Sequence, residues 1–371
     1  MKVLITGANG FVAKNLRTLL AERQDIEVVN FSRDHSTDEL SMFIRKVDFI
    51  FHLAGVNRPK NVEEYKSGNS DLTVTLCSLI EASGKIIPVV FGSSIQAELE
   101  NSYGRSKLAA EQSLLEFSNR TSNPIYLFRL PNVFGKWCKP NYNSVVATFC
   151  HNIAQNLPID INDASVPIHL VYVDDVVNRF ISIMDGAVTK EVYCNVDPVY
   201  EITIGKLVEK IKIFRASRNT LITERVGTGF DRALYSTYLS YLSPEKFSYA
   251  LVSHCDSRGD FVEMLKTKDS GQFSYFTTHP GVTRGGHYHN TKTEKFLVLN
   301  GEAVFRFRHI ITDEFHELKT SGQVPTVVET VPGWTHDITN IGDGVMFVML
   351  WANEIFDQDQ PDTYARSLSE K

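Results

Sequence analysis

The sequence predicts an α/β fold with a doubly wound parallel sheet, followed by an all-β domain. Up to about Tyr241, short apolar runs alternate with longer amphipathic stretches, which is typical of strands separated by helices. Beyond that point, aromatic and β-branched runs are separated by Gly, Asn and Asp, which favours a sandwich or barrel. The change falls at Ser243–Pro244, where the proline stops the preceding helix. We therefore predict two domains, residues 1–243 and 244–371.

Five apolar runs in the first half are the predicted parallel strands, each bounded by turn residues. Amphipathic stretches such as SKLAAEQSLLEFS, residues 106–118, are the predicted helices between them. The runs are KVLIT (2–6), EVVNF (27–31), DFIFHLA (48–54), IPVVFGSS (87–94) and IYLFRL (125–130). In the second half the predicted strands lie within 272–279, 293–310, 326–333 and 344–354.

Composition excludes several classes of protein. The formal net charge is −6 and no dense Lys/Arg stripe occurs, which argues against general nucleic-acid binding. Five scattered cysteines without a CxxC pair indicate free thiols in a reducing compartment. No apolar run has membrane-spanning length, and the first residues already have strand character, so we expect no signal peptide. These features predict a cytoplasmic protein that binds neither nucleic acid nor membrane.

The turn TGANGFVA, after the first strand, predicts a dinucleotide-binding site. Gly7 and Gly10 let the backbone approach a pyrophosphate, which then rests on the N-terminus of the next helix. The second strand ends without the acid that commonly binds the ribose of NAD. Arg33, just beyond it, can pair with a 2′-phosphate and favours NADPH, while the neighbouring Asp34 keeps NADH open.

The motif SYGRSK supplies a candidate acid/base. Tyr103 and Lys107 are four residues apart and so share one face of a helix. A lysine charge close to a phenol stabilises the phenolate, and we expect it to lower the pKa of Tyr103 from its ordinary value of about 10. Ser93 and Ser94 follow a strand and can bind a substrate carbonyl. Taken alone, a tyrosine and a lysine at this spacing are also consistent with an ordinary pair of side chains on the surface of a helix.

The order of the landmarks resembles the extended short-chain dehydrogenase/reductase family, which has a Rossmann-like sheet. TGANGFVA, DFIFHLAG, GSS, YGRSK, RLPNVFG and VYVDDV occur in family order between Met1 and Tyr241. The resemblance implies that Tyr103 is the acid/base, Lys107 its partner and ribose ligand, and Ser94 the carbonyl-binding group. Ala13 stands where the family usually has a third glycine. The implied cofactor contacts are Gly7, Asn9, Gly10, Phe11, Val12, Arg33, Leu53, Ala54 and Lys107.

The stretch HYHNTKTE predicts a metal site in the second half. His287 and His289 are two residues apart on an expected strand and so point to the same side. Glu294 follows at the next strand, and His336 lies further along in VPGWTHDITN. Three imidazoles and one carboxylate suit Zn²⁺, or Fe²⁺, Mn²⁺ or Ni²⁺.

These residues resemble the two motifs of the cupin family, so the second domain is expected to be a cupin barrel. The first motif takes Gly281, both histidines of the pair, Glu294 and Gly301, and the second takes Gly333, His336 and Asn340. The family's usual proline is replaced by Val331, with Pro332 shifted by one residue. Cupins serve many functions, so the fold alone does not decide the activity.

The pairing of the two domains resembles the bifunctional capsular polysaccharide synthesis enzymes of the UDP-N-acetyl-L-fucosamine pathway. That resemblance implies that the cupin domain epimerises C3 of a UDP-2-acetamido-2,6-dideoxy-4-keto-hexose. The reductase domain then reduces C4 with NADPH to give UDP-2-acetamido-2,6-dideoxy-L-talose. It also implies zinc and a homodimer. The candidate contacts to the UDP-sugar are Asn132, Asn143 and Arg232.

Two alternatives remain open. In one, the chain is a monofunctional NADP-dependent nucleotide-sugar enzyme whose cupin binds metal only for folding or dimerisation. In the other, it is a regulatory sensor of NADP(H) and sugar. The intact Ser94, Tyr103 and Lys107 set argues against the sensor, because a sensor has no need of it. The metal set does not separate the first alternative from a bifunctional enzyme, and the base that removes the C3 proton is not identified.

Overall fold

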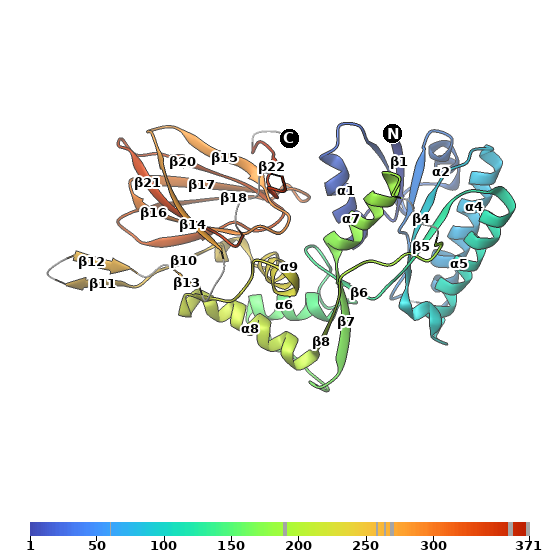
Figure 1. Cartoon of the computed structure of the whole chain (residues 1–371), viewed down its shortest axis with the longest axis horizontal. Coiled ribbons are helices and arrows are strands. Elements are labelled where there is room, and N and C mark those ends of the chain that lie inside the picture. Colours follow the sequence, from blue (N-terminus) through green and yellow to red (C-terminus); the bar gives the residue numbers. More distant parts are fainter. Residues whose placement is uncertain are drawn as a thin grey trace. The chain divides into compact units, whose positions relative to one another are not determined.

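The computed structural model divides the chain into two compact units, which Figure 1 shows in one view. Unit 1 comprises Met1–Ser144 and Pro167–Ile202, and unit 2 comprises Val145–Val166 and Thr203–Lys371. The structure describes residues 1–59, 61–187, 191–256, 259–262, 265–267, 271–354 and 359–368. Each unit has its own sheets and its own set of helices.

Unit 1 is built on a five-stranded parallel sheet in the order β2-β1-β3-β4-β5. The predicted doubly wound parallel sheet is thus confirmed, with all five predicted strands in it. The strands are β1 (Lys2–Thr6), β2 (Glu27–Phe31), β3 (Phe49–His52), β4 (Val89–Ser94) and β5 (Ile125–Leu130). A second sheet has the order β6-β7-β8, formed by β6 (Asn132–Phe134), β7 (Pro167–Tyr172) and β8 (Val199–Thr203).

Helices cover both faces of the five-stranded sheet, as Figure 1 shows for α1 and α7 on one face and α4 and α5 on the other. Successive side chains of β1 alternate between the two cores: Val3 and Ile5 enter one, and Leu4 enters the other. Burial on both faces explains why these strands are continuous apolar runs. The helices are α1 (Phe11–Ala21), α2 (Thr37–Ile44), α3 (Glu63–Tyr65), the π-helix η1 (Lys66–Asp71), α4 (Leu72–Ser83), the 3₁₀ helix η2 (Ile95–Glu98), α5 (Ser102–Thr121) and α7 (Val173–Met184).

Unit 2 combines helices with two five-stranded antiparallel sheets. One sheet has the order β10-β19-β16-β21-β14, and the other β18-β17-β20-β15-β22. The helices are α6 (Val145–Gln155), α8 (Ile204–Thr220), α9 (Gly229–Leu239) and the short η3 (Pro244–Lys246). The sheet strands are β10 (Ser248–Ala250), β14 (Gln272–Thr278), β15 (Thr283–Tyr288), β16 (Glu294–Asn300), β17 (Glu302–His309), β18 (Phe315–Ser321), β19 (Thr326–Glu329), β20 (Trp334–Asn340), β21 (Met346–Ala352) and β22 (Tyr364–Ala365).

The inner faces of the two sheets meet through aromatic side chains. The rings of Phe296 on β16 and Phe305 on β17 have centroids 5.7 Å apart. Phe247, just before β10, packs edge-on against Trp334 on β20 at 5.0 Å. The predicted all-β region is therefore present. Two small pairs complete the unit: β11 (Ser253–Asp256) with β12 (Gly259–Val262), and β9 (Ile222–Thr223) with β13 (Lys266–Thr267).

Three helices that precede residue 243, α6, α8 and α9, belong to the same compact unit as the sheets that follow it. Buried charges join these helices to the sheet that contains β16 and β19. Lys295 on β16 contacts Glu329 on β19, and Arg218 on α8 lies 2.9 Å from the same carboxylate. Burial alone would raise the pKa of Glu329, but the charges of Lys295 and Arg218 outweigh it and hold that pKa below its usual range. The division at 243/244 marks the change from helices to strands, and as a domain boundary it stays a prediction.

Among the described residues, the helices are all too short or too polar to cross a membrane.

Replacing Glu329 with Gln should destabilise unit 2 strongly. The substitution leaves two buried cations without their counter-charge, which costs about 3–5 kcal/mol. Urea unfolding of the full chain should show a clearly lower midpoint. Glu81→Gln, in the exposed pair with Arg120, is the matched control and should leave the midpoint nearly unchanged. Equal midpoints for both variants would show that the buried pair does not hold the layers together.

Candidate functional sites

The turn between β1 and α1 has the geometry of a phosphate-binding loop. Gly7 has φ +66°, and a Cβ at this position would lie 2.6 Å from the Cα of Ala54. Only glycine fits there, because both the backbone angle and the space exclude a side chain. Gly10 is the N-cap of α1 and offers no side-chain acceptor to the first turn of the helix. The amide groups of that turn are therefore the kind of donors that bind phosphate.

The other predicted cofactor contacts surround this turn. Asn9 is exposed, Phe11 and Val12 are half-buried on the first turn of α1, and Leu53 and Ala54 follow β3. Arg33 is exposed two residues beyond the end of β2. The amide of Ala54 donates to Thr6 Oγ1 over 3.2 Å, which ties the end of β3 to the end of β1.

A buried histidine that sequence reasoning missed fixes these strand ends. Thr73 donates its hydroxyl to the carbonyl of Asn69, so it accepts from His52 Nε2 at 2.9 Å. His52 Nδ1 then accepts the hydroxyl of Thr6 at 2.7 Å. Burial and the charge of Lys107 lower the pKa of His52 to about 3, which keeps the ring neutral as this chain of bonds requires. The signal in the sequence was one polar residue inside the apolar run DFIFHLA.

The structure brings Ser94 and Tyr103 together at the end of β4 and the start of α5, and Lys107, one turn further along α5, reaches the backbone of β4. Ser94 is hydrogen-bonded to the Tyr103 hydroxyl, and Lys107 donates to the carbonyl of Gly92 over 2.8 Å. Ser93 instead donates to the buried carboxylate of Glu111. Of the two serines considered from the sequence, Ser94 therefore faces the tyrosine and Ser93 does not.

The expected lowering of the Tyr103 pKa is wrong for this arrangement. Burial raises the pKa of Tyr103 to about 12, and the hydrogen bond from Ser94 opposes the shift only in part. Burial also lowers the pKa of Lys107 to about 8, while Glu111 raises it. A phenol that keeps its proton at neutral pH is suited to act as an acid, donating that proton to an oxygen that gains negative charge.

The three candidate sugar contacts lie in different units. Asn132 and Asn143 are exposed residues of unit 1, and Asn132 donates to the carbonyl of His169 over 3.3 Å. Arg232 lies on α9 of unit 2, where its guanidinium contacts the hydroxyl of Thr291 and lies 3.3 Å from Glu354. The described contacts thus join Arg232 to the segment between His289 and Glu294, and its role toward a substrate stays a prediction.

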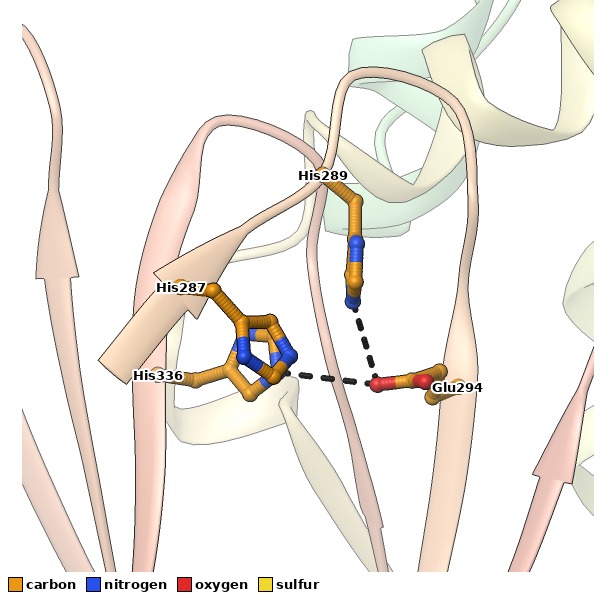
Figure 2. A group of neighbouring side chains, drawn as sticks. All are labelled: His287, His289, Glu294 and His336. Atoms are coloured by element: carbon orange, nitrogen blue, oxygen red, sulfur yellow. Dashed lines mark hydrogen bonds and ion pairs between the residues drawn. The ribbon is translucent and has the colours of Figure 1, made fainter. Parts of the chain in front are cut away.

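The four predicted metal ligands converge in unit 2, where Figure 2 shows their side chains turned toward one another. One ligand atom from each of His287, His289, Glu294 and His336 lies within 4.8 Å of the others. His289 Nε2 is 3.1 Å from Glu294 Oε2, and His336 Nε2 is 3.5 Å from the same oxygen. His287 on β15 pairs with His336 on β20, so strand register places these two rings together.

Backbone carbonyls orient two of the rings. His289 Nδ1 donates to the carbonyl of Asp362 over 2.6 Å, which leaves Nε2 directed at the cluster. His336 Nδ1 lies 3.5 Å from the carbonyl of Trp334. Metal-binding histidines commonly have such a partner on the other ring nitrogen. His336 Nε2 is buried and faces Glu294 Oε2.

Electrostatics keep the cluster in the form that binds a cation. Burial, helped by the neighbouring His336 and His289, lowers the pKa of His287 to about 3. Burial also lowers the pKa of His336. Burial alone would raise the pKa of Glu294, but hydrogen bonds from His289 and His336 hold that pKa well below its usual range. Three imidazoles and one ionised carboxylate form a donor set that fits Zn²⁺.

Two protein families match the chain. The NAD dependent epimerase/dehydratase family matches residues 3–195, which contain the glycine turn and the Tyr103–Lys107 pair. The polysaccharide biosynthesis C-terminal domain matches residues 254–364, which contain the histidine cluster. Each candidate site therefore lies within one of the two matched regions.

Individual proteins extend the comparison over the whole chain. A UDP-2-acetamido-2,6-beta-L-arabino-hexul-4-ose reductase from Pseudomonas aeruginosa is 60% identical over 370 residues, covering 100% of both chains. The crystal structure of the capsular polysaccharide assembling protein CapF from Staphylococcus aureus is 44% identical, with a TM-score of 0.69 and coverage of 99% and 100%. A UDP-glucuronic acid 4-epimerase from Bacillus cereus, at 17% identity and a TM-score of 0.52, covers 58% of this chain and 83% of its own, and shares the fold alone.

Replacing Arg33 with Ala should weaken NADPH binding and barely affect NADH. Arg33 is exposed beyond β2, where its guanidinium can make a charge-assisted contact with a 2′-phosphate. Loss of that contact should cost about tenfold or more in affinity. Fluorescence titration with each cofactor measures the difference. Equal weakening for NADPH and NADH would show that Arg33 does not contact the 2′-phosphate.

Proposed function

Because this chain belongs to the NAD dependent epimerase/dehydratase family, we propose that it reduces the C4 ketone of a UDP-2-acetamido-2,6-dideoxy-hexulose with NADPH. The observation that carries this proposal is the group formed by Ser94, at the carboxyl end of β4, with Tyr103 and Lys107 on α5. The printed name of the Pseudomonas relative supports the choice of substrate and reaction. The product would be UDP-2-acetamido-2,6-dideoxy-L-talose.

In the reduction, Ser94 and Tyr103 bind the ketone oxygen. Bound NADPH would supply the hydride to C4. The Tyr103 hydroxyl donates its proton to the oxygen, so that the C=O bond becomes an alcohol. The raised pKa of Tyr103 favours this direction, because the phenol is protonated before the hydride arrives. Lys107, whose pKa lies near 8, is close enough to neutrality to return a proton to the phenolate.

We further propose that unit 2 epimerises C3 of the same sugar before it is reduced. A divalent metal in the histidine cluster would polarise the ketone oxygen and make the neighbouring C–H acidic. The three neutral imidazoles add no charge, so only Glu294 offsets the charge of the cation and the site stays electropositive. Reduction removes the ketone that acidifies C3–H, so epimerisation has to come first.

Several finer features belong to this proposal. They are zinc as the metal, a cupin fold for residues 244–371, a homodimer, a cytoplasmic location and a role in capsular polysaccharide synthesis. The match to the polysaccharide biosynthesis C-terminal domain and the likeness to the capsular protein of Staphylococcus aureus support the last of these. Asn132, Asn143 and Arg232 are proposed to contact the UDP-sugar.

Tyr103→Phe tests the reductase site. The substitution keeps the ring but removes the transferable proton, so NADPH oxidation should fall by about 10²–10⁴-fold. Exchange of C3–H in D₂O should continue at the wild-type rate, since the histidine cluster is unchanged. Spectrophotometry of NADPH and mass spectrometry of the ketone measure the two steps. NADPH oxidation near the wild-type rate would overturn the assignment of Tyr103.

His336→Ala and His287→Ala test the metal site. Each removes one of four ligands, so the metal content of purified protein should fall and C3 exchange should be lost. Both variants should still reduce ketone that is already epimerised. His151→Ala, a histidine on α6 outside the cluster, is a control that should keep its metal. If wild-type protein exchanges C3–H at full rate without stoichiometric metal, the metal mechanism is wrong.

A further inference from the structure

We propose that Asp362 is a positioning residue of the metal centre, and that its carboxylate and its backbone carbonyl together set the place of His289. This inference rests on the proposed metal-binding role of His287, His289, Glu294 and His336. Asp362 lies in the C-terminal segment 359–368, far along the chain from the ligands that it contacts.

The Asp362 carboxylate holds the segment that connects two of the ligands. Its Oδ1 accepts the amide of Asn290 at 2.9 Å, and its Oδ2 accepts the amides of Thr291 at 2.7 Å and Lys292 at 2.6 Å. Oδ2 also accepts the Thr291 hydroxyl at 2.9 Å. Three consecutive amides on one anion form a concave nest of donors. Because these residues directly follow His289 and precede Glu294, the carboxylate fixes the spacing of the two ligands.

The electrostatics of these contacts agree with a permanent anion. Burial alone would raise the pKa of Asp362, but the amides of Asn290, Lys292 and Thr291 outweigh it and hold that pKa below its usual range. Arg232 Nη2 lies 3.9 Å from Oδ2 and adds a favourable charge. The segment from Asn290 to Thr293 is buried, so its amides need partners within the protein.

The backbone of the same residue orients the ligand itself. The carbonyl of Asp362 accepts from His289 Nδ1 at 2.6 Å, which leaves Nε2 as the nitrogen directed at Glu294. Asp362 has φ +38°, a left-handed conformation that is uncommon for a residue other than glycine. The contacts on both sides of the residue hold it in this conformation.

Neighbouring residues of the C-terminal segment make further contacts with the residues that carry or follow the metal ligands. The ammonium group of Lys292 donates hydrogen bonds to the carbonyl of Pro361 over 3.2 Å and to Thr363 Oγ1 over 2.7 Å. β22 then pairs with β15, with Ala365 opposite His287. The ligand-bearing residues 287–292 are therefore bound at several points by a segment that carries no ligand of its own.

Zinc affinity of full-length variants tests the proposal. Asp362→Gly removes the carboxylate but permits the left-handed backbone and keeps the carbonyl, and Asp362→Asn removes only the charge and one acceptor oxygen. We expect about 10–100-fold weaker zinc binding for Asp362→Gly, measured by competition with a chromophoric chelator, and a smaller loss for Asp362→Asn. The d–d spectrum of the Co²⁺-substituted Asp362→Gly protein should also change, because the place of His289 changes.

Asp313 provides the matched control. It is another aspartate with positive φ in unit 2, at +61°, and its carboxylate is exposed and paired with Arg308 rather than with the ligand segment. Asp313→Gly should bind zinc and Co²⁺ like the wild type.

Three results would contradict the inference in distinguishable ways. Wild-type affinity and an unchanged Co²⁺ spectrum in Asp362→Gly would overturn the positioning role alone. An equal loss of affinity in Asp313→Gly would show a general effect on stability and would also overturn it. Absence of zinc and Co²⁺ binding by the wild type would overturn the proposed metal site, and this inference with it.

Discussion

Unit 2 depends on one strand, β16, which carries opposite charges on neighbouring residues. Glu294 and Lys295 are adjacent and both buried, and alternation along a strand directs them to opposite faces of the sheet. Glu294 reaches the histidine cluster, and Lys295 pairs with Glu329, which Arg218 of α8 also contacts. Since a buried charge without a partner is costly, both pairs constrain the strand. The position of Glu294 is thus linked to the packing of the helices in the same unit.

A comparable arrangement on α5 supports the site in unit 1. Tyr103, Lys107 and Glu111 follow one another at intervals of four residues and so share one helix face. Glu111 is buried and is paired with Arg129, while Ser93 donates to it from β4. These contacts fix the helix against the sheet at the depth where Tyr103 meets Ser94. In both units, the side chain proposed to react or to bind metal lies on the same helix or strand as a buried ionic contact that fixes that element.

Much of this arrangement could be predicted from local patterns. The parallel sheet follows from continuous apolar runs, and the meeting of His287 with His289 and Glu294 follows from close spacing in the sequence. Asp362 could not be found in this way, because its role depends on hydrogen bonds to residues that no sequence periodicity connects to it. For His52 the pattern shows a polar residue inside an apolar run but not the residues to which it is hydrogen-bonded. The pKa of Tyr103 was mispredicted because spacing gives the distance to a lysine but not the extent of burial, which dominates here. The association of α8 and α9 with the sheets of unit 2 rests on tertiary contacts, such as those of Arg218 on α8 and Arg232 on α9, and is likewise absent from the local pattern.

The central claim is that one chain first exchanges the proton at C3 and then reduces the ketone at C4. The most direct measurement is to convert the UDP-4-keto sugar to product with unlabelled NADPH in D₂O, and to analyse the isolated alcohol by NMR and mass spectrometry. The account predicts one solvent deuterium at C3 and protium at C4 of the alcohol. As a control, ketone incubated in D₂O without protein for the same time should carry no deuterium. An alcohol that carries protium at both carbons would contradict the account, because reduction would then have occurred without epimerisation.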